Sequence, residues 1–117
     1  MSLLTALAIG LGGAAGALSR ALIGRLLSGP FPLATLLVNV LGCFLLAAFT
    51  AALPTDSTVT HALLGSGFYG AFTTFSTFIL ETVLLFRSGQ PHRAAAYLFL
   101  TLFLCSLASW LGISLVT

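Results

Sequence analysis

A cluster of glycines and hydroxyl residues lies inside one long apolar stretch of this 117-residue chain, at residues 61–86. Three glycines come first and four hydroxyl residues follow: Gly65, Gly67, Gly70, then Thr73, Thr74, Ser76 and Thr77. Glycine weakens a helix, and hydroxyl groups can bond the backbone groups that a broken helix frees. Irregular backbone at membrane depth persists only inside protein or beside a watery cavity. The pattern predicts a helix break at about residues 70–74 beside an ion or solute site, with a glycine-rich packing face as the alternative.

Three polar side chains share one depth in the predicted membrane spans. Arg20 and Glu81 each lie about six residues before the end of a span, and Asn39 lies about six residues after the start of another. At about 1.5 Å per residue, all three lie about 9 Å inside the same side. Ionisable groups inside a span are costly and are therefore functional candidates. Arg20 and Glu81 predict a polar vestibule, or alternatively a structural ion pair.

A polar row follows one face of the last apolar stretch. Its members are spaced by four residues: Tyr97, Thr101, Cys105 and Ser109. Phe75 and Phe78 approach the same depth, and the edge of an aromatic ring carries partial positive charge. Asn39 can donate two hydrogen bonds, and the hydroxyls of Ser76, Thr77, Tyr97 and Thr101 one each. These groups predict an anion path, whereas ordinary core or lipid-facing phenylalanines are the alternative.

The composition indicates an integral membrane protein. Hydrophobic residues make up 59% of the chain and charged residues 5%, against about 25% in soluble domains. Four apolar stretches reach the roughly 20 residues that span a bilayer: 3–26, 33–53, 61–86 and 94–116. All four prolines are expected between these stretches: Pro30, Pro32, Pro54 and Pro91. We therefore predict an all-α fold, a single integral membrane domain over residues 1–117 with its first span retained.

Short connections predict antiparallel neighbours, with both termini on one side and the loops at about 27–32 and 87–93 on the other. Gly12 and Gly16 have the spacing that allows close helix packing. Because four helices can barely enclose a pore, an oligomer in the lipid bilayer is expected. The two cysteines, Cys43 and Cys105, are interpreted as small core residues.

The few charges predict an orientation. Arg25, Arg87 and Arg93 flank the loops on one side, whereas the opposite side has only Asp56 and the terminal groups. The positive-inside rule would place those loops in the cytoplasm. A chain that inserts both ways should show little such bias. Two hypotheses follow: a homodimer whose arginines are masked by burial, or a heterodimer with an oppositely biased homologous subunit.

Several segments together resemble one known family. They are GFYGAFTTFSTF at 67–78, GGAAGALSR at 12–20 and PLATLLVNVLG at 32–42, with Glu81 shortly after the first. Over nearly the whole chain, in order and spacing, the sequence resembles the small fluoride channels, the Fluc or CrcB proteins. The resemblance implies a fluoride-selective channel, not an enzyme, that passively exports fluoride from the cytoplasm and relieves its toxicity.

The resemblance also implies an antiparallel dual-topology dimer with two pores in a bacterial or archaeal inner membrane, and no nucleic-acid partner. Phe75 and Phe78 would line the fluoride path, Asn39 would donate to the ion, and Tyr97 and Thr101 would lie on a polar track. Backbone carbonyls of Gly70 and Thr73 from both subunits would hold a structural sodium ion.

Two other functions compete with this one. A proton-coupled small multidrug exporter is also a dual-topology four-helix dimer, but it needs a carboxylate within its first helix, where this chain has only Arg20 as an inner charge. A non-transporting assembly subunit would need neither a broken helix nor an aligned row of donors. Flux in liposomes separates the three: fluoride, an organic cation, or neither.

Overall fold

The computed structural model describes residues 1–53 and 58–117, and these residues are almost entirely helical. Within them, four helices are long and apolar enough to cross a membrane: Leu3–Leu26, Leu33–Ala52, Thr58–Arg87 and Pro91–Val116. The described ranges contain no strand. The prediction of an all-helical chain with four spans is thus confirmed.

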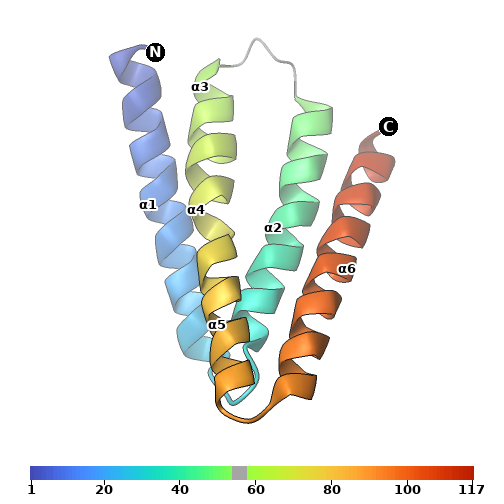
Figure 1. The fold of residues 1–117 in the computed structure, drawn as a ribbon. Helices are drawn as coiled ribbons and strands as arrows, with labels where there is room; N and C mark the ends of the chain where they lie inside the picture. The colour runs from blue at the N-terminus through green and yellow to red at the C-terminus, as the bar shows by residue number, and fades with distance from the viewer. Residues whose placement is uncertain (54–57) are drawn as a thin grey trace.

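The four spans alternate in direction (Figure 1). Both termini lie at one end of the molecule, and the connection from α1 (Leu3–Leu26) to α2 (Leu33–Ala52) lies at the other end. The turn into α6 (Pro91–Val116) lies beside that connection. This arrangement confirms the predicted up-and-down order. Pro54 and Asp56, which entered the sequence argument, lie outside the described residues.

Two helix starts involve proline. Pro32 is the N-cap of α2 and lies between spans, as predicted. Pro91, in contrast, is the first residue of α6, so the predicted start at residue 94 and the predicted loop position of Pro91 are wrong. Proline fits the first turn of a helix because its missing N–H would have had no intrahelical partner there.

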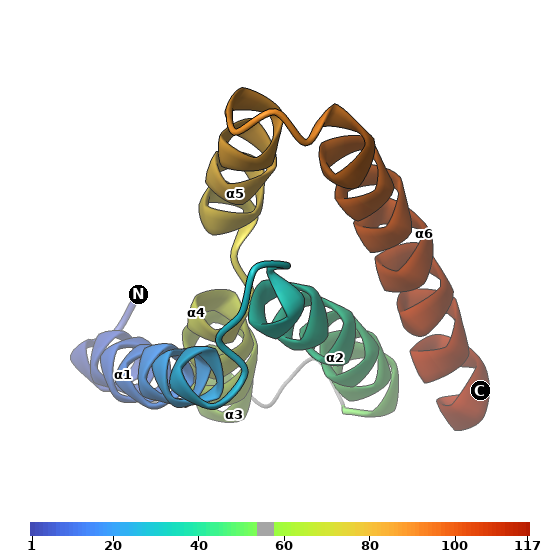
Figure 2. The same cartoon turned by 90° about the horizontal axis from the view of Figure 1, so that it is seen from below.

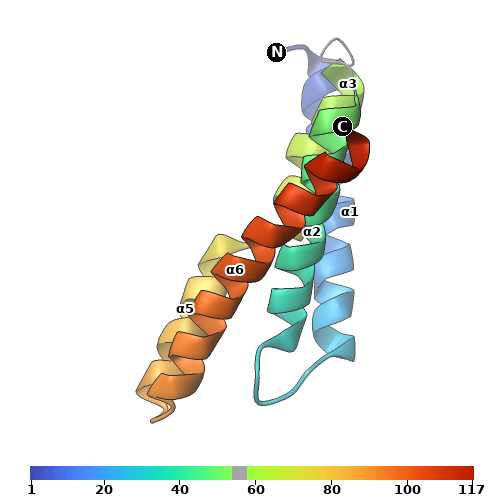
Figure 3. The same cartoon turned by 90° about the vertical axis from the view of Figure 1, so that its right-hand side faces the viewer.

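The third span consists of several helical pieces. It contains α3 (Thr58–Thr60), the π-helix η1 (His61–Tyr69), α4 (Gly70–Phe72) and α5 (Phe75–Arg87). Thr73 has φ −80° and ψ 155°, and Thr74 has φ −149° and ψ 121°, so both residues are extended. Beyond them, α5 leans away from α1 and α2 (Figure 3). The π-helix was not predicted.

Glycines allow the helices to approach closely. A Cβ atom at Gly12 would collide with the carbonyl oxygen of Leu63 in η1, and one at Gly16 with the carbonyl oxygen of Phe68. At the other side of the molecule, a Cβ at Gly112 of α6 would meet the carbonyl oxygen of Phe44 in α2 at 2.5 Å. The predicted packing role of Gly12 and Gly16 is confirmed.

The pieces therefore form two packed pairs, α1 with η1 and α2 with α6, while α5 packs against α6. Seen from below, α5 lies away from the row formed by α1, α4 and α2, and α6 runs from α5 back toward α2 (Figure 2). A buried cluster joins α2, α5 and α6; its members are Leu36, Phe78, Leu85, Ala94 and Tyr97. The extended residues between α4 and α5 thus lie where these groups of helices meet.

Candidate functional site

Asn39 of α2 binds the backbone of the extended segment in both directions. Its Nδ2 donates to the carbonyl oxygen of Thr74 at 3.0 Å, and the Thr74 N–H donates to Asn39 Oδ1 at 2.8 Å. Asn39 is buried, with 7% of its surface exposed. One of the two predicted amide donors is therefore already engaged by the protein, and the other N–H remains as a candidate for an anion.

Arg20 of α1 binds the end of α4. Its Nε donates to the carbonyl oxygen of Ala71 at 3.0 Å. In an uninterrupted helix that carbonyl would accept from the N–H of residue 75, so the guanidinium replaces a lost backbone donor and also complements the negative end of the helix dipole. Among the described residues Arg20 forms no ion pair with Glu81.

Thr74 also begins α5. Its Oγ1 accepts from the Thr77 N–H at 3.2 Å and lies 3.1 Å from Thr77 Oγ1. A threonine at this position is a normal N-cap, because its hydroxyl satisfies an N–H that lacks a helical partner. Side chains from α1, α2 and α5 together thus satisfy backbone groups on both sides of the interruption.

Two backbone carbonyls were predicted to bind sodium, those of Gly70 and Thr73. In an α-helix the Thr74 N–H would donate to the Gly70 carbonyl, but here it donates to Asn39. The extended conformation of Thr73 likewise takes its carbonyl out of the helical direction. Free carbonyl oxygens are suitable ligands for a hard cation. Metal-ligating clusters of three or more histidine, cysteine or acidic residues are absent from the described ranges.

A cavity of about 270 Å³ lies between α2, α5 and α6; we call it the phenylalanine cavity. Phe75 and Phe78 both line it, with ring centroids 5.9 Å apart and an edge-to-face angle of 62°. Phe78 is 3% exposed, whereas Phe75 is 73% exposed. The other lining residues are Asn39, Cys43, Thr73, Thr74, Thr101, Leu102, Cys105 and Ser106.

The Thr101 hydroxyl is the distinctive group on this wall. Thr101 is 4% exposed, and its Oγ1 is buried with no hydrogen-bond partner among the described residues. A buried hydroxyl without a partner costs about 1–3 kcal/mol. A hydroxyl donor suits a small anion, and the edges of the two phenylalanine rings that line the same cavity also carry partial positive charge.

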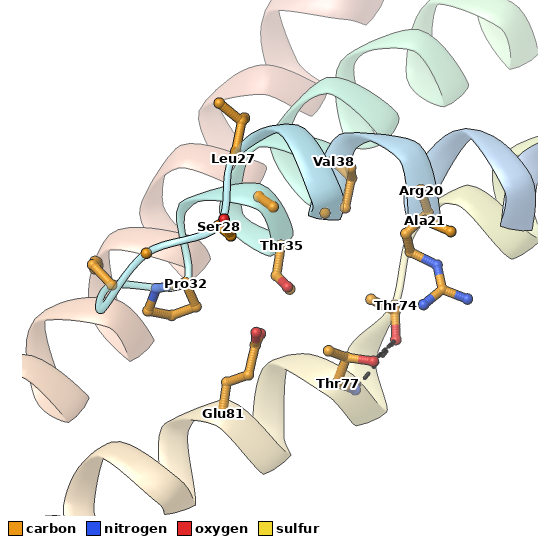
Figure 4. A pocket seen from close by; sticks show the side chains of 14 residues that line it. Arg20, Ala21, Leu27, Ser28, Pro32, Thr35, Val38, Thr74, Thr77 and Glu81 are labelled. Carbon is orange, nitrogen blue, oxygen red and sulfur yellow. Dashed lines mark hydrogen bonds between the residues drawn. The ribbon is translucent and has the colours of Figure 1, made fainter.

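A second cavity, of about 380 Å³, lies toward the short loops; we call it the loop-side cavity. Arg20 of α1 and Glu81 of α5 both line it, with Thr74 and Thr77 between them (Figure 4). Glu81 Oε1 accepts a hydrogen bond from the Tyr97 hydroxyl at 3.0 Å. Because Thr74 lines both cavities, the extended segment lies between them.

The predicted site residues fall into distinct groups. Asn39, Phe75, Phe78 and Thr101 meet at the phenylalanine cavity, and Thr77, Arg20 and Glu81 at the loop-side cavity. Ser76 is exposed and lines neither of these two cavities. Tyr97 is fully buried; its ring packs against Phe78 at 5.2 Å, and its hydroxyl reaches Glu81.

Sequence reasoning missed several lining residues, among them two on α2 close to Asn39. Thr35 is buried on the wall of the loop-side cavity, and Cys43 lines the phenylalanine cavity. Each lies four residues from Asn39 along α2, so a search for polar residues at helical spacing around Asn39 would have identified both.

Comparison with known proteins places the chain in a family. The sequence pattern described as "CrcB-like protein, Camphor Resistance (CrcB)" matches residues 7–113. A protein of Campylobacter lari named "Fluoride-specific ion channel FluC" is 40% identical over 114 residues, which cover 92% of this chain and 93% of the relative. "Fluoride-specific ion channel FluC 2" of Moorella thermoacetica is 44% identical over 112 residues, which cover 89% of each chain.

A third relative, "Fluoride-specific ion channel FluC 2" of Rhodococcus jostii, is 40% identical over 116 residues, which cover 97% of this chain and all of the relative. These names describe ion channels and not enzymes, in agreement with the prediction for this chain. The four apolar helices agree in turn with a multi-pass membrane protein. On a match that spans most of its length and on the identity to these relatives, the chain belongs to the CrcB-like family.

Proposed function

We propose that the chain is a fluoride-selective channel that lets fluoride leave the cytoplasm passively and so relieves its toxicity. One observation carries the proposal: Thr101, whose buried hydroxyl has no partner among the described residues, lines a cavity together with Phe75 and Phe78. The names of the relatives support the same ion.

The chemistry of the cavity favours fluoride over chloride. Fluoride is small and strongly hydrated, so it needs several close donors to replace its water shell, and a narrow donor-lined path excludes larger anions. The Thr101 hydroxyl, the second Asn39 N–H and the edges of Phe75 and Phe78 are such donors. None of them carries a full charge, so none would hold the anion too tightly to release it.

Passive movement agrees with the polar groups available. The first span contains no carboxylate, which a proton-coupled exporter would need there. An inside-negative potential drives a monovalent anion outward by about 2.3 kcal/mol per 100 mV. In this scheme the loop-side cavity is the vestibule, where the Arg20 guanidinium attracts the anion.

The proposal includes an antiparallel dual-topology dimer with two pores. The 73% exposure of Phe75 supports a second subunit, because a ring that lines a sealed path needs protein on its open side. A break at mid-membrane depth requires the same protection, since the extended residues 73 and 74 would otherwise face lipid.

A structural sodium ion at the dimer axis completes the scheme. Each chain offers two freed carbonyl oxygens, at Gly70 and Thr73, and a hard cation of this kind takes several oxygen ligands. Two copies would supply four, and with one copy the set is incomplete. Sodium would thus stabilise the dimer and take no part in moving fluoride.

Orientation distinguishes a homodimer from a heterodimer. Arg25, Arg87 and Arg93 are all exposed near the loop end, which favours a cytoplasmic position for that end. We favour the homodimer, because the donors and rings are present within this chain. A Ser88→Cys variant on a background without the native cysteines tests this in intact cells. Labelling from both faces of the membrane supports dual topology. Labelling from the cytoplasm alone would mean that a second, homologous kind of subunit with the opposite orientation must exist.

Efflux from liposomes that contain the purified protein tests the function. We expect fluoride to leave and chloride to stay. Phe75→Ile and Phe78→Ile keep apolar bulk but remove the positive ring edge, so each should reduce fluoride efflux strongly while the dimer still assembles. Organic-cation flux would instead support a multidrug exporter, and unchanged fluoride efflux in both variants would remove the rings from the path.

A further inference from the structure

The two cysteines of the chain, Cys43 and Cys105, meet on one wall of the phenylalanine cavity. They come from different helices, α2 and α6, and both are partly exposed to the cavity side. Both cysteines line the phenylalanine cavity from neighbouring helices, and α2 and α6 are the most extensively packed pair of elements among the described residues. The wall of this cavity thus carries two reduced thiols, one from each helix.

The pair is in register with the proposed donors. Cys43 follows Asn39 by four residues on α2, and Cys105 follows Thr101 by four residues on α6. Residues four apart lie on the same face of a helix, one turn from each other. All four residues line the phenylalanine cavity. The thiols thus extend the polar side of this cavity by one helical turn on both helices.

We propose that Cys43 and Cys105 form a two-coordinate site for a soft metal ion of the Cu(I), Ag(I) or Hg(II) class. Thiolates select soft ions of this kind. Two metal–sulfur bonds of about 2.3 Å span about 4.6 Å at most, so the site requires the two sulfur atoms to approach to that separation at the cavity wall. Hard ions such as Mg²⁺ and Ca²⁺ are excluded, because they require several oxygen ligands.

The binding step balances without an oxidant. Two thiols and one mercuric ion give one neutral S–Hg–S bridge and two released protons, and no atom changes its oxidation state. With a monovalent ion the same step leaves the bridge with one negative charge. A bridge at this position occupies space beside Thr101 and the rings, and a charged one also repels an anion. Metal binding should therefore stop conduction; this consequence rests on the proposed function, whereas the site itself does not.

Mercuric ion is the probe for the site. The purified full-length chain is incubated with HgCl₂ in the presence of excess free cysteine, which competes with single thiols but poorly with a chelating pair. We expect one bound mercury per chain and the loss of both titratable thiols. Cys43→Ser and Cys105→Ser should each lose the metal to the competitor, and both variants keep the other thiol as a matched control.

Efflux is then measured on the same samples. Mercury should abolish fluoride efflux in the native chain, and it should have no effect in the Cys43→Ala, Cys105→Ala double variant. Two mercury ions per chain, or full retention of mercury by either single variant, would overturn the shared site. Bound mercury with unchanged efflux would overturn the block. If the metal-free protein fails to conduct fluoride, the proposed function fails, and the stoichiometry still tests the site.

Discussion

Asn39 and Thr74 exchange two hydrogen bonds across 35 positions of sequence, with the side-chain amide of one meeting both backbone groups of the other. An amide is the side chain that can both donate and accept in this plane. The contact attaches α2 to the extended segment between α4 and α5, and it keeps buried backbone groups satisfied where the helical pattern is interrupted.

Asn39→Leu should therefore destabilise the protein, by about 1–3 kcal/mol for each backbone group left without a partner. Asn39→Asp retains an acceptor for the Thr74 N–H but cannot donate to the Thr74 carbonyl while ionised. The ionised carboxylate would also be a buried charge opposite the Thr74 carbonyl oxygen, so this variant should lose at least as much stability as the leucine variant. Thermal unfolding in detergent measures both effects.

Thr50→Ala provides the control for these variants. Thr50 is exposed, and its hydrogen bonds within the described part of the chain go to carbonyls of its own helix, so its replacement should leave the unfolding temperature nearly unchanged. Equal stability of Asn39→Leu and the native protein would contradict the structural role of the amide.

The depth of the polar residues could be predicted from sequence, but their partners could not. A rise of about 1.5 Å per residue places Arg20, Asn39 and Glu81 at one level. The rise per residue contains no information on the direction in which each side chain points away from its helix axis. Arg20 instead reaches a carbonyl that only an interrupted helix leaves free, and Glu81 meets Tyr97 because α5 packs against α6.

The helix ends and the π-helix show a similar limit. Four spans follow from length and hydropathy, which are averages over many residues. The start of α6 at Pro91 depends on a single first-turn position, and proline is compatible both with a loop and with that position. No residue pattern in the sequence distinguishes the wide π-helical turns at His61–Tyr69 from ordinary α-helix. The contacts of η1 with α1 join residues far apart in the chain, so local sequence does not predict them.

Thr101→Val separates conduction from stability. Valine has nearly the shape of threonine and lacks the hydroxyl that has no partner among the described residues. We expect equal or higher thermal stability, because an unsatisfied buried group is removed. Fluoride efflux should fall about tenfold or more, since a hydrogen bond to an ion is worth about 1.5–3 kcal/mol. Reduced stability with unchanged efflux would assign Thr101 a purely structural role.

Arg20→Gln should destabilise the chain by about 1–3 kcal/mol, because the Ala71 carbonyl loses the guanidinium donor across the interface of α1 and α4. Arg25→Gln removes the same charge from an exposed position on the same helix and serves as the matched control. Unfolding temperatures of the two variants are compared directly. If both variants lose equal stability, the net charge and not the bond to Ala71 is responsible.

Tyr97→Phe tests the contact that positions Glu81. The phenylalanine ring can keep the packing against Phe31 and Phe78, but the hydrogen bond to the carboxylate is lost. Hydrogen bonds to charged groups contribute about 1.5–3 kcal/mol, so the unfolding temperature should fall. A Glu81→Gln, Tyr97→Phe double variant then completes a double-mutant cycle. A coupling energy near zero would show that the two side chains act independently.

Gly12→Ala and Gly16→Ala test the close approach of α1 to the third span. At both positions a Cβ would collide with a backbone carbonyl oxygen, of Leu63 and of Phe68, and backbone cannot rotate away as a side chain can. We expect a loss of about 1–3 kcal/mol from this overpacking.

Gly10→Ala is the matched control, because no atom of the described residues lies within 4 Å of a Cβ there. Alanine also favours a helix over glycine by about 0.8–1.0 kcal/mol, so the control should be neutral or more stable. Unfolding temperature and elution volume in detergent distinguish the variants. Equal behaviour of Gly10→Ala and Gly12→Ala would mean that α1 and η1 are not held at this short distance.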